Sequence, residues 1–207
     1  MIRPPGFRGA AFSTAEDGDV RADPAARRVL AGLLGISPEW ATVRQVHGNR
    51  VVAADRSGLL GPADGLFTSR VGLPVSVAVA DCVPVILEGE TGVGVVHAGW
   101  RGLVQGVIQA LRQAMQAAGL RPRRAALGPS IGPCCYEVGP EVAGRFPDRL
   151  ATTTWGTVSV DLWSAAEESL SGLAVWRADS CTRCQEGFFS HRRDGTPGRQ
   201  VGVAWLG

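Results

Sequence analysis

The sequence predicts one mixed α/β domain, spanning residues 1–207, in which helices flank mixed β-sheets. Short apolar runs that are typical of buried strands, such as 75–80 and 93–96, alternate with segments of helical spacing, above all 103–119. The hydrophobic fraction of 45% over 207 residues is sufficient for one continuous core. Since no repeat, low-complexity stretch or linker interrupts the sequence, we expect a single domain.

The N-terminal part combines short strands with one capped helix. Asp23 followed by Pro24 is typical of an N-cap and a first helical position, and predicts a helix that continues to Gly35. His47-Gly48-Asn49 interrupts a strand pattern and indicates a bulge or a tight turn. The elements predicted here are a strand at 10–14, a helix at 24–35, a strand pattern at 41–55, a turn at 61–65 and a strand-like segment at 66–68.

The rest of the chain alternates strands and helices. Pro84 predicts that the strand at 83–87 is an edge strand or is kinked, because proline cannot donate to a sheet ladder. The glycines and prolines of 128–139 predict a loop of specific shape, and Asp161 predicts a helix N-cap. The other predicted elements are strands at 75–80, 93–96, 125–127, 153–160, 174–177 and 200–206, helices at 103–119 and 162–170, and a helical turn at 140–146.

Charge and composition argue against two classes of partner. A net charge of +2 is too small for a nucleic-acid surface, and the 21 basic residues, all arginine, are scattered. The N-terminus lacks the apolar core of a secretory signal and no run is long enough to cross a bilayer, so we expect a cytoplasmic protein without membrane contact. In a reducing compartment the five cysteines are thiols or metal ligands rather than disulfides.

The segment T-G-V-G-V-V-H-A-G-W-R-G, residues 91–102, places a histidine at the end of a predicted strand and an arginine at the start of a helix. The unpaired N–H groups of a first helical turn favour an anion, and Arg101 adds a forked donor suited to phosphate or carboxylate. The alternative is a buried histidine and a surface arginine beside an ordinary turn.

His47, Cys82 and His97 each lie at the end or at an interruption of a predicted strand. Two imidazoles and one thiolate suit zinc or copper, and three protein ligands leave a coordination position open for catalysis. Such a metal could lower the pKa of a bound water or polarise a substrate oxygen. A Cys82–His97 nucleophile–base pair and ordinary core residues are the alternatives that the spacing leaves open.

The other cysteines do not predict a complete site. Cys181-x-x-Cys184 is half of a structural zinc site, but no second C-x-x-C or H-x-H pair completes it. Cys134 and Cys135 could contribute only with an awkward local geometry. We therefore expect the C-x-x-C pair to be two buried or half-buried thiols, and His191 to be a hydrogen-bonded surface histidine.

Several charged residues are candidates for substrate handling, and for the three arginines among them a solvated surface role is the alternative. The candidate anion binders are Arg101, Arg192 and Arg199, which lie beside glycines or turns. Asp64 and Asp81 could orient metal ligands or transfer protons. Glu137 could do the same, or could cap a helix that begins at Pro140.

A set of segments matches one known family in order and spacing over roughly residues 40–204. The segments are R-Q-V-H-G (44–48), A-D-G-L-F-T (63–68), D-C-V-P-V-I-L (81–87), H-A-G-W-R-G (97–102), G-P-S-I-G-P-C-C-Y-E-V (128–138), D-L-W (161–163), C-T-R-C (181–184), F-F-S-H-R-R (188–193) and G-R-Q (198–200). They resemble the YfiH-like family, also called the laccase-domain or multicopper polyphenol oxidase family. The resemblance implies a layered architecture shared with YfiH proteins and with the toxin domains called CNF.

The resemblance implies a purine nucleoside phosphorylase that converts adenosine, inosine, guanosine or methylthioadenosine, with phosphate, to free base and ribose 1-phosphate. It also implies adenosine deaminase activity and one zinc, with copper as a possible replacement, held by His47, Cys82 and His97. We expect Asp64 and Asp81 to be catalytic. The residues expected to bind substrate or phosphate are Arg44, Arg101, Arg192, Arg199, Cys134, Tyr136 and Glu137. The oligomeric state stays open, with a homodimer as one candidate.

Three other functions compete with this one. One is a cysteine-dependent amide hydrolase that uses Cys82 and His97, and another is a non-catalytic, peptidoglycan-related binding factor with a closed metal site. A copper polyphenol oxidase is disfavoured, because one His/Cys/His set cannot build several copper sites. The chain also departs from the family in a short region 15–35 and in His191, which stands where the family has tyrosine.

Overall fold

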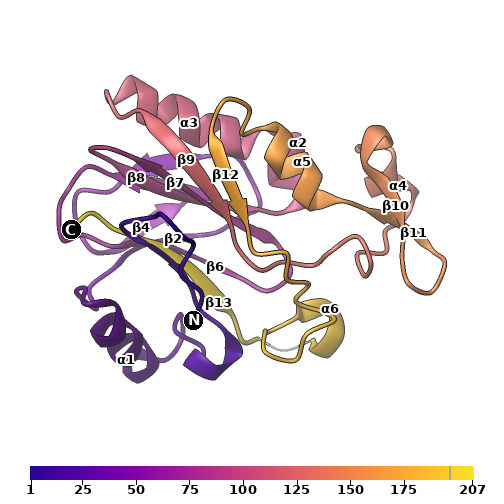
Figure 1. Ribbon diagram of the computed structural model, residues 1–207, viewed down its shortest axis with the longest axis horizontal. Coiled ribbons are helices and arrows are strands. Elements are labelled where there is room, and N and C mark those ends of the chain that lie inside the picture. Colours follow the sequence, from indigo (N-terminus) through magenta and orange to yellow (C-terminus); the bar gives the residue numbers. More distant parts are fainter. Residues whose placement is uncertain (196) are drawn as a thin grey trace.

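The computed structural model describes residues 1–195 and 197–207 and forms two β-sheets packed face to face, with helices on their outer faces (Figure 1). One apolar core lies between the two sheets, and each sheet has a second core against its helices. The mixed α/β class predicted from the sequence is confirmed.

The six-stranded sheet is the centre of the molecule, and its middle strands are buried on both faces. Val85 and Val96 pack toward the helices, whereas Ile86 and Val95 pack toward the second sheet, as the alternation of side chains in a strand requires. In spatial order its strands are β12 (Ala174–Arg177), β9 (Pro122–Leu127), β7 (Val83–Gly89), β8 (Val93–Ala98), β5 (Gly65–Thr68) and β3 (Val51–Ala53).

The prediction of an edge strand at Pro84 is wrong, because β7 lies between β9 and β8. Pro84 is the second residue of β7, and its carbonyl accepts the N–H of Gly128, which follows the last residue of β9. The missing N–H therefore falls where the pairing with β9 ends, and the ladder loses little.

The five-stranded sheet contains both ends of the chain. Its strands, in spatial order, are β1 (Ala10–Phe12), β13 (Gln200–Ala204), β6 (Val75–Val79), β2 (Ala41–Arg44) and β4 (Gly58–Pro62). The strand pattern at 41–55 divides into β2 in this sheet and β3 in the other, so that 45–50 crosses between the sheets. Residues 61 and 62, predicted as part of a turn, end β4 instead.

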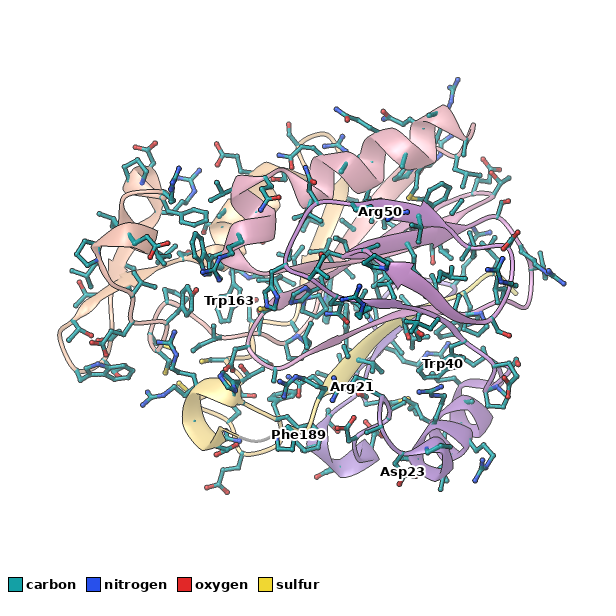
Figure 2. The ribbon with its side chains drawn as sticks, turned by 180° about the vertical axis from the view of Figure 1, so that it is seen from behind. Arg21, Asp23, Trp40, Arg50, Trp163 and Phe189 are labelled. Carbon is teal, nitrogen blue, oxygen red and sulfur yellow. The ribbon has the colours of Figure 1, made fainter. Side chains whose placement is uncertain are left out.

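Helix α1 (Pro24–Leu34) follows its predicted signals and covers the outer face of the five-stranded sheet. The Asp23 carboxylate accepts the N–H of Ala25, and Gly35 ends the helix in the left-handed region with φ 70°. Trp40 is buried in the core between this helix and the sheet (Figure 2).

On the outer face of the six-stranded sheet lie α2 (Trp100–Val104), α3 (Val107–Ala117) and α5 (Leu162–Glu168) (Figure 1). The prediction of a single helix at 103–119 is wrong, because the structure has two helices there and the first begins earlier. The helix already begins at Trp100, and Gly106, with φ 75°, separates α2 from α3. A left-handed glycine cannot continue a right-handed helix, although the apolar spacing runs on through it.

A small hairpin of β10 (Leu150–Thr152) and β11 (Val158–Val160) projects from one end of the molecule beside α4 (Pro140–Ala143) (Figure 1). The strand predicted at 153–160 is therefore a turn followed by β11. The Asp161 carboxylate caps α5 as predicted, by accepting the N–H groups of Trp163 and Ser164. Short 3-10 helices span Ala15–Asp17 and Pro147–Arg149, and α6 spans His191–Asp194. Among the described residues, no helix is both long enough and apolar enough to pass through a bilayer.

Candidate metal centre

A pocket of about 510 Å³ has walls from both sheets. It brings the three predicted metal ligands to one place, although 50 positions separate His47 from His97 in the sequence. His97 is the fifth residue of β8, Cys82 stands between β6 and β7, and His47 lies in the crossover after β2. The lining residues that were also predicted to bind substrate are Arg44, Tyr136, Arg192 and Arg199.

The donor atoms of His47, Cys82 and His97 all lie within 4.8 Å of one another. The two imidazole rings meet edge to face, with centroids 4.7 Å apart. A Cβ atom on Gly99 would lie 3.1 Å from the Cys82 sulfur and 3.1 Å from Cδ2 of His47. The glycine of the H-A-G-W-R-G segment thus leaves the space in which the three side chains converge.

Asp64 supports this arrangement through hydrogen bonds to the backbone around His47 and to the ring of His97. Its carboxylate is fully buried and accepts the backbone N–H groups of Val46, His47 and Gly48 at 2.7–3.2 Å. His47 has φ 59°, a conformation that costs energy for a residue with a side chain. Three N–H bonds to one carboxylate hold the backbone in that conformation and aim the imidazole into the pocket.

The same carboxylate fixes the tautomer of His97. Nδ1 of His97 lies 2.9 Å from Asp64 Oδ1, and both side chains are buried. Burial acts to raise the pKa of Asp64, but the bonds from His97 and the backbone outweigh it, and the pKa lies below its ordinary value. An ionised Asp64 accepts a hydrogen bond from the Nδ1 proton, so Nε2 of His97 faces Cys82 and would bind a metal once it loses its own proton.

The thiol of Cys82 is activated by its neighbours. Burial acts to raise its pKa, but hydrogen bonds with His47 and His97 lower it to about 6. Burial acts to lower the pKa of His97, whereas its bonds with Asp64 and Cys82 raise it to about 9. Two imidazoles and a readily ionised thiol, with an outer carboxylate, form a donor set that fits zinc.

Asp81 lies at the edge of the pocket, and both of its carboxylate oxygens are engaged. Oδ1 accepts the Thr182 hydroxyl at 2.6 Å, and Oδ2 accepts the backbone N–H of Arg192 at 2.7 Å. Asp81 also has a positive φ, 84°. It therefore ties the segment before Cys82 to the start of α6.

The predicted phosphate-binding arginines divide into two groups. Arg44, Arg192 and Arg199 line the pocket, as does Arg21, which no sequence motif marked. Arg101 is not among the lining residues, and its guanidinium stacks on Trp100 with 4.4 Å to the ring centroid.

Tyr136 and Arg192 form one wall of the pocket. The Arg192 guanidinium lies 5.2 Å from the Tyr136 ring centroid and donates to the carbonyl of Glu137 at 2.7 Å. Burial and the nearby negative charge of Cys82 raise the pKa of Tyr136 to about 12. The phenol is therefore protonated at neutral pH and can donate a hydrogen bond.

Besides Arg101, two predicted substrate-binding residues lie outside the lining of this pocket. The Glu137 carboxylate accepts the indole N–H of Trp155 at 2.9 Å, and Cys134 lies in a group with Cys135, Cys181 and Cys184. The expectation of two buried or half-buried thiols in the C-x-x-C segment holds for Cys181, which is buried, and is wrong for Cys184, which is exposed. His191 is exposed as predicted and also lines the pocket.

Known proteins resemble this chain over nearly its whole length. Residues 7–207 match the protein family described as multi-copper polyphenol oxidoreductase laccase. A Corynebacterium glutamicum protein named purine nucleoside phosphorylase is 37% identical over 205 residues, covering 91% of this chain and 83% of its own length. A Streptomyces coelicolor protein of the same name is 39% identical over 208 residues, covering 91% and 86%.

Solved structures agree with the fold. The crystal structure of YlmD from Geobacillus stearothermophilus has a TM-score of 0.85 and 28% sequence identity, covering 100% of this chain and 98% of that one. The structure of Bacillus licheniformis YfiH has a TM-score of 0.82 at 28% identity, covering 91% and 82%.

Proposed function

The chain belongs to the multi-copper polyphenol oxidoreductase laccase family, which the resemblance to YfiH-like proteins led us to expect, and we propose that it is a zinc-dependent purine nucleoside phosphorylase. The proposed substrates are phosphate with adenosine, inosine, guanosine or methylthioadenosine, and adenosine deamination is a proposed second activity. The observation that carries the proposal is one pocket that combines the His47–Cys82–His97 donor set with arginines.

Phosphorolysis breaks the bond between C1′ of the ribose and the purine nitrogen, and forms a bond from C1′ to a phosphate oxygen. Arg44, Arg192 and Arg199 would bind the phosphate and hold it against the ribose, because guanidinium groups match phosphate oxygens in charge and geometry. The purine leaves with a negative charge on its nitrogen, which a hydrogen bond stabilises and a proton neutralises. Tyr136, which lines the pocket and is protonated at neutral pH, would donate to the base or the sugar.

His47, Cys82 and His97 would hold the zinc, which when bound supplies a Lewis acid beside the substrate. Asp64 acts through His97, whose tautomer it fixes, rather than by contact with substrate. Asp81 would position Arg192 through the backbone N–H of that residue.

The test is purine release from adenosine and inosine, with and without phosphate, before and after chelation and zinc re-addition. We expect release that depends on both phosphate and metal, with inosine formed from adenosine in the absence of phosphate. Arg44→Ala should raise the KM for phosphate by about tenfold or more, whereas Arg56→Ala, at an exposed arginine that pairs with Asp55, should not. Release that needs neither phosphate nor metal would contradict the proposal.

A second candidate is a cysteine-dependent amide hydrolase, and the lowered pKa of Cys82 beside His97 favours it. It predicts that alkylation of Cys82 abolishes activity while chelation does not. A multicopper oxidase has no such support, since three histidines in the whole sequence cannot supply several copper sites.

A further inference from the structure

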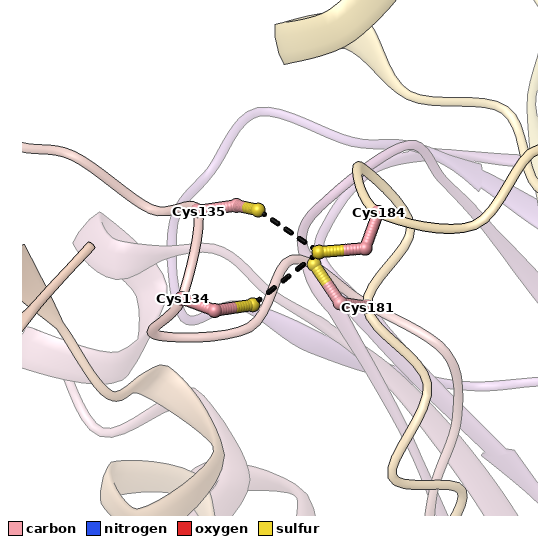
Figure 3. A group of neighbouring side chains, drawn as sticks. All are labelled: Cys134, Cys135, Cys181 and Cys184. Carbon is pink, nitrogen blue, oxygen red and sulfur yellow. Dashed lines mark hydrogen bonds between the residues drawn. The ribbon is translucent and has the colours of Figure 1, made fainter. Parts of the chain in front are cut away.

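A second group of donor atoms lies outside the pocket and has no part in the function proposed above. The sulfurs of Cys134, Cys135, Cys181 and Cys184 all lie within 4.8 Å of one another. Cys184 is 3.1 Å from Cys135 and 3.5 Å from Cys134, sulfur to sulfur. Figure 3 shows two of the side chains reaching from the loop after β9 and two from the turn after β12, with their sulfurs facing a shared centre.

We propose that these four cysteines hold a structural zinc ion as a tetrathiolate site. Zn–S bonds of about 2.3 Å in a tetrahedron place the sulfurs about 3.8 Å apart. The sulfur separations of 3.1 and 3.5 Å at Cys184 are shorter than this, and no pair is more than 4.8 Å apart, so small side-chain shifts would give the tetrahedron. Four thiolates select zinc over the hard cations magnesium and calcium. Four protein ligands also fill the coordination sphere, so this site holds structure and leaves no position for substrate.

The surroundings suit a bound cation. The backbone N–H of Gly132 donates to the Cys181 sulfur at 3.2 Å, an outer contact that stabilises a thiolate ligand. Cys135 and Cys181 are buried, whereas Cys184 is exposed, which gives the ion a path of entry. One disulfide at Cys184 would use only one of the two sulfurs that approach it and would leave two of the four thiols unused, whereas one zinc ion would use all four.

The proposed zinc would join two walls of the pocket. Cys135 directly precedes Tyr136, and Cys181 directly precedes Thr182, whose hydroxyl binds Asp81 next to Cys82. The carbonyl of Cys134 also accepts the N–H of Thr154 in the β10–β11 turn. The ion would therefore fix the loop, the turn and the hairpin relative to one another, whatever reaction the pocket performs.

The test isolates this site in the Cys82→Ser variant, which removes a thiol from the other centre. After dialysis against a moderate chelator, Cys82→Ser should retain one zinc per chain by elemental analysis, and Cys82→Ser/Cys184→Ser should retain none. Cobalt substitution of Cys82→Ser should give intense thiolate-to-cobalt absorption, which the second substitution reduces. Activity is not needed for either readout, so failure of the proposed phosphorylase reaction would leave this result intact.

The unmodified protein provides a measurement that does not depend on the folding of variants. Titration with a mercurial reagent should release the tightly held zinc only as about four thiols react. A thiol count on protein denatured without a reductant should find all five cysteines as free thiols. Three thiols would indicate a disulfide, and iron in place of zinc would indicate an iron–sulfur type centre. Either result, or a full thiol count with no zinc in Cys82→Ser, would overturn the proposal.

Discussion

Replacing Asp64 with asparagine should damage both the fold and the metal centre, because one carboxylate serves both. The side chain is fully buried and accepts hydrogen bonds from three backbone N–H groups and from Nδ1 of His97. Asparagine keeps one acceptor oxygen and turns the other into an NH₂ donor. Whichever way the amide points, that donor faces an N–H group that now lacks an acceptor.

The cost can be worked from these contacts. Removing one member of a buried, hydrogen-bonded charge pair costs about 3–5 kcal/mol, and an unsatisfied buried donor alone costs about 1–3 kcal/mol. For a chain of this size, a loss of about 3–5 kcal/mol lowers Tm by roughly 6–20 °C. Loss of the bond that orients a metal-ligating histidine weakens metal binding by about 10–100-fold.

Urea unfolding and competition with a chromophoric zinc chelator measure the two effects separately. Asp55→Asn is the matched control, because that carboxylate is 82% exposed and should change stability by less than about 0.5 kcal/mol. If Asp64→Asn unfolded at the same urea concentration as the control and bound zinc equally well, the carboxylate would not be the support that the structure indicates.

Three further predictions test other parts of the structure. Gly99→Ala should weaken zinc binding about tenfold in the same competition assay, because the new Cβ would lie 3.1 Å from the Cys82 sulfur. Gly32→Ala should raise the free energy of unfolding in urea by about 0.5–1 kcal/mol, because the residue is inside α1 with open space around its Cβ, and an unchanged midpoint would refute this. Burial acts to raise the pKa of Asp17, but hydrogen bonds led by the one from Thr14 hold the pKa below 3.8. Its stabilisation is therefore present above about pH 4 and lost as the pH falls through the lowered pKa, so the urea midpoints of wild type and Asp17→Asn should differ at about pH 7 and approach each other as the pH falls below about 4.

The parts of the fold that the sequence predicted well are those with local signals. The two ends of α1 follow from residue types whose preference is local: Asp23 is the N-cap, Pro24 the first helical residue and Gly35 the C-cap. The structure confirms all three assignments. The break at Gly106 was missed because the apolar spacing continues through it. The edge-strand prediction at Pro84 failed because it depends on which strands pair with β7, and that is set by tertiary structure. Pro84 lies where the pairing of β7 with β9 ends.

The site shows the same division. His47, Cys82 and His97 were marked by their places at strand ends and by the family resemblance, and the fold gathers them in one pocket. The four-cysteine group was missed because Cys184 lies 49 and 50 positions from the cysteines that it contacts. No spacing rule joins a Cys-Cys pair to a distant C-x-x-C pair. Arg21 likewise lines the pocket from the turn before α1, and no local motif marks it.

The two metal centres differ in what holds them together. Around the first, Asp64 fixes the backbone of His47 and the ring of His97 through hydrogen bonds that need no ion. That centre is preformed by the protein, so loss of its metal should remove chemistry but little structure. In the second, Cys134, Cys135 and Cys184 contact one another through thiols. Backbone N–H bonds at Ser130 join the two loops on one side of the cysteines. On the side of Cys134 and Cys135 the ion would supply the cross-link, because S–H contacts are weak, and its loss should loosen the pocket wall that carries Tyr136.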